Sequence, residues 1–236
     1  MTAYTIEELL SNNSYPGRGI ILGQTPDGRH GVAAYFIMGR SVNSRNRIFV
    51  PIGEELQIRA YDEKLLSDPS LIIYWPIRRW KDQTIVTNGD QTDTIYQGLD
   101  AGLGFEDTLM SRCYEPDEPN FTPRISGLIE LSPKFAYRLS ILKRENESGV
   151  CGRYSYRYEP TPGRGHLIHT YQQDGAPLPT FIGEPKPVCL MDDIDSFTES
   201  LWSSLNRDNR ISLVVRYIDL QDGSFTQRVI NKHEEE

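Results

Sequence analysis

Short strand-like segments separated by turn residues dominate this sequence, and that pattern restricts the possible folds more than any other feature. Helical segments are fewer, and they fall in blocks between groups of strands. Grouping of this kind favours an α+β domain with layered sheets over a parallel βαβ arrangement. Strands are expected at residues 18–23, 31–39, 48–51, 57–60, 70–74, 84–87, 124–131, 135–143, 152–158, 167–171, 211–219 and 224–230.

Helices are expected where capping residues precede apolar side chains at helical spacing. Thr5 begins a capping-box pattern and a short helix that ends by residue 13. Asp93 can cap a helix over residues 94–103, and a second helix follows over 105–113. Residues 192–206 carry apolar side chains at spacings of three and four, which predicts an amphipathic helix.

Composition and charge limit the class of protein. With 38% hydrophobic and 25% charged residues, the chain is expected to be globular rather than disordered. We interpret residues 1–236 as a single domain, with an N-terminal extension at 1–14 and a charged tail at 231–236. A net charge of −8 argues against a nucleic-acid partner, although a local cluster of arginines can still hold a small anion.

The sequence also favours a cytoplasmic protein with no membrane association. No apolar run is long enough to span a bilayer, and the first residues lack the basic and apolar regions of a signal peptide. The three cysteines, Cys113, Cys151 and Cys189, are widely spaced and odd in number. They fit a reducing compartment, in which we expect buried free thiols.

The first candidate site is an arginine-rich segment at residues 39–47. Arg40, Arg45 and Arg47 are interleaved with serine and asparagine, directly after an apolar strand. A guanidinium group can donate two parallel hydrogen bonds to the oxygens of a phosphate. Hydroxyl and amide groups can donate further hydrogen bonds to the same phosphate. The alternative interpretation is a solvated basic loop.

Two further segments carry polar groups suited to chemistry. Residues 87–94 form a Gly-containing turn before a helix, where free backbone N–H groups suit anions; a plain Asn-Gly turn with a helix cap is the alternative. Residues 114–124 form a loop stiffened by prolines that carries three carboxylates, a tyrosine and an arginine. Such a set can transfer protons, and the alternative is an acidic surface turn.

The sequence lacks the common signatures of other enzyme classes. None of the four histidines belongs to a metal-binding pattern, and no HExxH or CxxC spacing occurs. The phosphate-binding patterns GxxxxGK[ST] and GxGxxG and the GxSxG elbow are also absent. We therefore expect no metal and no other cofactor.

Taken in order, these segments resemble those of the archaeal-type IMP cyclohydrolase family. The resemblance covers roughly residues 15–190. Its matching elements are a Gly-Arg opening at 17–23, Arg40-Ser41 with Asn46-Arg47, Tyr74 with Arg78, an Asn-Gly-x-x-Thr-Asp-Thr-Ile turn at 88–95, the block at 114–125, and Thr170-Tyr171.

The resemblance implies both a fold and an activity. The implied fold is a four-layer α-β-β-α sandwich similar to the N-terminal-nucleophile hydrolases, without their processed nucleophile. The implied enzyme is a cofactor-independent cyclohydrolase, a hydrolase acting on cyclic amidines in purine biosynthesis. It converts 5-formamidoimidazole-4-carboxamide ribotide to IMP with loss of water. A small-molecule purine nucleotide is thus the expected substrate, and a homo-oligomer the expected assembly.

The resemblance also suggests roles for individual residues. Proton transfer and oxyanion stabilisation would fall to Tyr74, Tyr114, Glu115 and Arg124. The residues expected to bind substrate are Arg18, Arg40, Ser41, Asn46, Arg47, Asn88, Thr92, Asp93, Asn120 and Thr122. Of these, Arg18, Arg40 and Arg47 are the candidates for the 5′-phosphate, and Asn88, Thr92 and Asp93 for the ribose or base.

Two other functions stay open at the level of sequence. One is a non-catalytic, purine-nucleotide-binding regulatory protein that keeps the pocket but not the reaction. The other is an amidohydrolase of the N-terminal-nucleophile type, with Thr2, Cys113 or Cys151 as the nucleophile.

Overall fold

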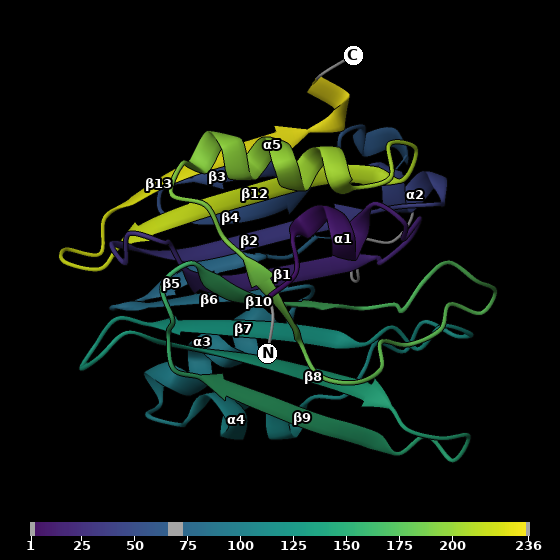
Figure 1. Cartoon of the computed structure of the whole chain (residues 1–236). Coiled ribbons are helices and arrows are strands. Elements are labelled where there is room, and N and C mark those ends of the chain that lie inside the picture. Colours follow the sequence, from purple (N-terminus) through teal and green to yellow (C-terminus); the bar gives the residue numbers. More distant parts are fainter. Residues whose placement is uncertain (1–2, 66–72, 235–236) are drawn as a thin grey trace.

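Two antiparallel sheets make up most of the computed structural model, which describes residues 3–65 and 73–234. The first sheet has six strands in the order β11-β10-β1-β2-β12-β13 (Figure 1). In chain order these strands are β1 (Arg18–Gln24), β2 (His30–Met38), β10 (Arg164–His169), β11 (Lys186–Cys189), β12 (Arg210–Asp219) and β13 (Phe225–Asn231).

The second sheet has seven strands, which follow one another in chain order. They are β3 (Ile48–Ile52), β4 (Glu55–Arg59), β5 (Ile77–Trp80), β6 (Gln83–Thr87), β7 (Arg124–Glu130), β8 (Ala136–Arg144) and β9 (Cys151–Tyr158). Each strand pairs with its neighbour in sequence. The long segment between β6 and β7 contains helices, and these helices pack on one face of the sheet.

The main core lies between the two sheets. Ile20 and Leu22 of β1 belong to the same buried cluster as Ile129 and Leu139 of the second sheet. Ile21, between them in sequence, points to the opposite face of its sheet and joins a separate cluster. This alternation follows from the two-residue period of a strand. Since both faces of β1 are covered, the strand is apolar almost throughout.

The helices cover the outer faces of the sheets (Figure 1). α1 (Ile6–Leu10) and α5 (Ile194–Ser204) pack on the six-stranded sheet. α3 (Gln91–Asp100) and α4 (Phe105–Thr108) pack on the seven-stranded sheet. The remaining short elements are α2 (Val42–Arg45) and the 3-10 turns η1 (Glu63–Leu65), η2 (Leu109–Ser111) and η3 (Lys232–Glu234). The predicted α+β class is confirmed.

Two strands, β5 and β11, were not expected from the sequence. In β5 the apolar pattern is broken by Arg78 and Arg79, which ion-pair with Glu55 and Glu54. β11 is an edge strand and contains a proline, so its pattern is weak. The predicted strand at 70–74 is not found where it can be checked: residues 73 and 74 belong to no strand, and 70–72 lie outside the described residues.

Three smaller predictions were wrong. Asp93 does not cap a helix: α3 begins at Gln91, and the Asp93 carboxylate accepts a hydrogen bond from Arg78 Nη1 at 2.8 Å. The thiols are not all buried, because Cys113 and Cys189 are exposed. The charged C-terminal tail was also expected to be solvated, but the His233 ring stacks on the Tyr61 ring, with the ring centroids 4.2 Å apart.

No helix in the described part of the chain has the length and apolar character needed to cross a membrane.

Candidate active site

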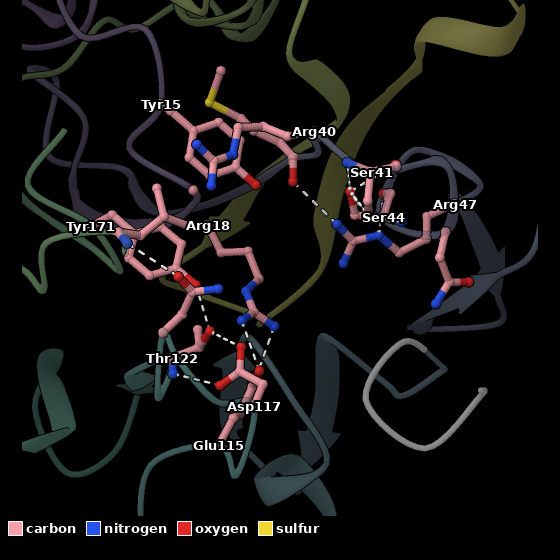
Figure 2. A pocket seen from close by; sticks show the side chains of 15 residues that line it. Tyr15, Arg18, Arg40, Ser41, Ser44, Arg47, Glu115, Asp117, Thr122 and Tyr171 are labelled. Atoms are coloured by element: carbon pink, nitrogen blue, oxygen red, sulfur yellow. Dashed lines mark hydrogen bonds and ion pairs between the residues drawn. The ribbon is translucent and has the colours of Figure 1, made fainter. Parts of the chain in front are cut away.

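A cavity of about 390 Å³ opens beside the first residue of β1 and the last residue of β2. That size is within the range of small-molecule sites. Five segments supply its walls: the chain around Arg18, the segment 38–47 with α2, the acidic loop at 115–122, Tyr171 after β10, and Leu178 (Figure 2). The acidic loop and the arginine segment, which are far apart in sequence, therefore face one cavity.

A buried ion pair between Arg18 and Glu115 forms one wall of this cavity. Arg18 Nη1 and Nη2 donate to Glu115 Oε1 and Oε2 at 3.0 and 2.9 Å, in a two-pronged arrangement (Figure 2). The side chains are only 10% and 4% exposed. Burial raises the pKa of the Glu115 carboxyl above its ordinary value, although Arg18 acts in the opposite direction. Such a carboxylate accepts a proton more readily than one on the surface.

Backbone contacts hold this ion pair in place. Arg18 Nη1 also donates to the carbonyl oxygen of Asn88 at 2.9 Å. The Glu115 amide donates to the Thr122 carbonyl at 2.8 Å, which closes the acidic loop. At Gly89 a Cβ atom would lie 2.6 Å from Arg124 Nη1, so a larger residue there would require the Arg124 side chain to move.

The opposite wall carries two more arginines and small polar groups. Arg47 is buried and donates to the carbonyl oxygens of Ser44 and Met38, at 2.8 and 3.1 Å. Arg40 is more exposed; it lies over the Tyr15 ring at 4.8 Å and pairs with Asp174. The positive charges of these two arginines make this wall suitable for binding an anionic group.

An asparagine in this wall has an unused acceptor. Asn43 lines the cavity, and its Oδ1 atom is buried without a hydrogen-bond partner among the described residues. Buried polar atoms are nearly always paired in native proteins, so this oxygen suits a donor on a bound molecule.

Hydroxyl groups line the third side of the cavity. The Thr122 hydroxyl donates to the Asp117 carboxylate and also hydrogen-bonds the Tyr171 hydroxyl (Figure 2). Burial raises the pKa of Tyr171 to about 12, although Arg18 acts in the opposite direction. Tyr171 is therefore protonated near neutral pH and is a hydrogen-bond donor rather than a base.

Comparison with known proteins assigns this chain to a family. The family model described as IMP cyclohydrolase-like protein matches residues 15–223. The chain belongs to this family. The matched region contains every segment of the cavity wall, including the two that carry Arg18 and Glu115.

Individual relatives carry the name IMP cyclohydrolase. One from Methanopyrus kandleri is 34% identical over 167 residues, which is 66% of this chain and 75% of the relative. One from Methanocella arvoryzae is 33% identical over 120 residues, or 49% and 57% of the two chains. One from Methanosphaera stadtmanae is 27% identical over 172 residues, or 68% and 75%.

The structure brings half of the predicted site residues to the cavity of this IMP cyclohydrolase-like chain. The residues that line it are Arg18, Arg40, Ser41, Arg47, Glu115, Asn120 and Thr122. Tyr74 lies behind them, with its hydroxyl 2.7 Å from that of Tyr35. Burial raises the pKa of Tyr74 above its ordinary value, and the charges of Arg18 and Arg47 act in the opposite direction. Tyr74 is therefore close enough to both arginines to interact with their charges.

Three other predicted residues lie close behind the acidic loop rather than in the cavity wall. Asn88 uses its side-chain amide on the backbone of Pro123 and Ile125, at 2.8 and 2.9 Å. Arg124 pairs with Asp90 at 2.6 Å. The Tyr114 hydroxyl donates to the Gly149 carbonyl at 2.9 Å.

The last three predicted residues make local contacts away from the cavity wall. Asn46 exchanges two hydrogen bonds with the Asp62 backbone, at 2.8 and 2.7 Å. The Thr92 hydroxyl contacts Thr87 and donates to the Gly89 carbonyl at 3.0 Å. Asp93 pairs with Arg78, as described above.

Sequence reasoning missed several residues of the cavity wall. Asp117 belongs to the acidic loop and Tyr171 to the Thr-Tyr element, so both stood in segments already singled out. Asn43 and Ser44 lie inside the arginine-rich segment. Tyr15 and Leu178 had no motif to mark them, because they reach the cavity only through folding. Within the described residues, no group of three His, Cys, Asp or Glu side chains is placed to hold a metal ion.

His169, which lies next to this wall, should make the unfolding free energy of the protein depend on pH. Burial lowers the pKa of His169 to about 4, and its Nδ1 lies 2.8 Å from the Tyr171 carbonyl oxygen. Between pH 6.5 and 4 the unfolded chain therefore takes up a proton that the folded protein does not. The unchanged protein should therefore lose unfolding free energy as the pH falls from 7 to 4. We expect His169→Gln to lose less, by up to about 3 kcal/mol. Urea unfolding at both pH values measures this, and parallel pH profiles would contradict it.

Proposed function

We propose that this chain catalyses the dehydrative ring closure of 5-formamidoimidazole-4-carboxamide ribotide to IMP. Support comes from its family and from relatives that carry the name IMP cyclohydrolase. The observation that carries the proposal is the buried Arg18–Glu115 pair, set in a cavity with two further arginines. A buried acid–base pair near a cationic wall fits a nucleotide whose base must gain and lose protons.

The reaction is intramolecular. The carboxamide nitrogen attacks the neighbouring formyl carbon, a carbinolamine forms, and loss of water gives the aromatic ring of IMP. Both reacting groups are on one molecule, so the protein's main task is to hold the conformer in which they touch. Two proton transfers and stabilisation of charge on the formyl oxygen complete its role. We propose that no metal or redox cofactor takes part.

The cavity suggests which end of the substrate lies where. Arg40 and Arg47, with the Ser41 hydroxyl, would hold the 5′-phosphate. The base would then lie against the Arg18–Glu115 pair, where Glu115 takes the proton from the attacking nitrogen. Arg18 would stabilise the negative charge that develops on the formyl oxygen. Thr122 and Tyr171 provide hydroxyl groups beside the same point.

The predicted residues outside the cavity wall would act through this pair. The charge of Arg124 opposes the rise that burial causes in the pKa of Glu115. Arg124 therefore affects that carboxyl without lining the cavity. Asn88 holds Arg18 through its carbonyl oxygen, and Tyr74 lies among the same charges. Tyr114 anchors the start of the acidic loop through its hydroxyl bond to the Gly149 carbonyl. We assign positioning roles to all four. For Asn46, Thr92 and Asp93 we propose roles in holding the turns that flank the site.

The wider organisation is part of the proposal. The helices on the two outer faces fit a four-layer α-β-β-α sandwich similar to the N-terminal-nucleophile hydrolases, without a processed nucleophile. Thr2, the residue that such a nucleophile would require, lies outside the described residues. We further propose a single domain over residues 1–236, a cytoplasmic homo-oligomer, and no nucleic-acid partner.

Asp174 offers a test of the phosphate position. Its carboxylate pairs with Arg40 at the cavity, in a place where a phosphate would compete for the same guanidinium. We expect Asp174→Asn to bind IMP about fivefold more tightly at low salt, because Arg40 loses its internal counter-ion. Isothermal titration calorimetry measures this. Glu199→Gln, on the exposed side of α5, is the control and should leave affinity unchanged. Weaker binding in Asp174→Asn would contradict this phosphate position.

The proposed function is tested by a direct assay. The purified protein is mixed with the formamido ribotide, and IMP is followed by ultraviolet absorbance, with and without EDTA. We expect turnover that EDTA does not change. Binding of IMP without any conversion would favour the regulatory alternative. Turnover that thiol alkylation does not change, together with an intact Met1, would count against an amidohydrolase.

A further inference from the structure

Cys113 and Cys151 are far apart in sequence but lie on segments that run side by side. Arg153 Nη2 donates to the carbonyl oxygens of Met110 and Arg112, at 3.3 and 2.8 Å. On the other side of the cysteines, the Tyr114 hydroxyl donates to the Gly149 carbonyl at 2.9 Å. Three hydrogen bonds thus hold the chain around Cys113 against the beginning of β9, whose first residue is Cys151.

The hydrogen bonds between these two segments bring the two cysteines to the same junction. Both cysteines are free, and the Cys113 thiol is close enough to affect the pKa of Cys151. Cys113 is exposed and belongs to no helix or strand, so it is accessible and its segment can adjust. Cys151 is half-buried, and burial together with the Cys113 thiol raises its pKa. Because Cys113 is exposed and Cys151 is half-buried, Cys113 is the thiol that small reagents meet first.

We propose that Cys113 and Cys151 form a modification site, which closes to a reversible intramolecular disulfide by exchange with a low-molecular-weight disulfide. The Cys113 thiolate attacks one sulfur of the small disulfide, a mixed disulfide forms, and one small thiolate leaves. The Cys151 thiol then loses its proton to solvent and attacks the Cys113 sulfur, which releases the second small thiolate. The protein gives up two electrons and two protons, and the small disulfide is reduced to two thiols.

The location of this site gives it a route to the cavity. Cys113 precedes Glu115 by two residues, at the start of the acidic loop. The disulfide would tie that start to β9, at the edge of the seven-stranded sheet. Cys189, which is also exposed, lies on β11 in the other sheet and contacts the Ala3 carbonyl oxygen at 3.8 Å. It provides an internal comparison.

The test uses oxidised glutathione on the full chain and needs no substrate, so it is independent of the proposed reaction. Remaining thiols are alkylated, and peptides are identified by mass spectrometry. We expect a linked Cys113–Cys151 peptide that dithiothreitol removes. Cys151→Ser should stop at a glutathione adduct on Cys113, whereas the control Cys189→Ser should still form the internal bond. A stable glutathione adduct on Cys113 in the unchanged protein, a link from Cys113 to Cys189, or no reaction at Cys113 would overturn the proposal.

Discussion

Replacement of Glu115 by glutamine is expected to reduce ring closure by about 10²–10⁴-fold, the range for loss of a general base. Glutamine keeps the size of the side chain but cannot accept the proton of the attacking nitrogen. Turnover of the formamido ribotide under saturating conditions measures the effect. Binding of IMP should change far less, because the arginines that would hold the phosphate lie on the opposite wall.

The control for this variant is Glu118→Gln. Glu118 is an exposed carboxylate in the same loop, and it does not line the cavity. Its replacement should leave turnover unchanged. Equal activity in Glu115→Gln and Glu118→Gln would remove Glu115 from the mechanism, provided that both proteins melt well above the assay temperature.

The Arg18–Glu115 pair makes a second prediction, in which stability and activity separate. Arg18→Met leaves the Glu115 carboxylate buried without its partner, and we expect a loss of about 3–5 kcal/mol in unfolding free energy. The double variant Arg18→Met, Glu115→Leu removes both charges. A buried ion pair is often replaceable by apolar groups of similar volume, so its stability should return to within about 1 kcal/mol of the unchanged protein.

Activity should not return with stability in the double variant. If Glu115 and Arg18 take part in the reaction, the folded double variant still lacks both the base and the cation. Urea unfolding and turnover measured on the same preparations make the comparison. A double variant that is stable and active would show that the pair has only a structural role.

The segments of the site could be predicted from the sequence, but their assembly could not. Strand alternation and turn residues locate β1, β2 and the paired strands β7 and β8 closely. They do not show that Arg18 on β1 reaches Glu115 on the loop before β7 of the other sheet, which is a contact set by the stacking of the sheets.

Two of the predicted site residues that lie outside the cavity wall are the small polar residues Asn88 and Thr92. Asn88 follows a strand and Thr92 lies in the first turn of α3, a place where ligand-binding residues often occur. The same positions suit side chains that satisfy the backbone of a tight turn, and that is what both do here. Tyr171 and Leu178 reach the cavity only because β10 pairs with β1 and carries the following loop to its end.

A crystal structure with IMP bound tests the central claim most directly, because the claim is that one cavity joins the arginine segment to the acidic loop. We predict the phosphate of IMP at Arg40 and Arg47 and the purine ring beside Arg18 and Glu115. IMP bound at any other surface, with this cavity empty, would contradict the account.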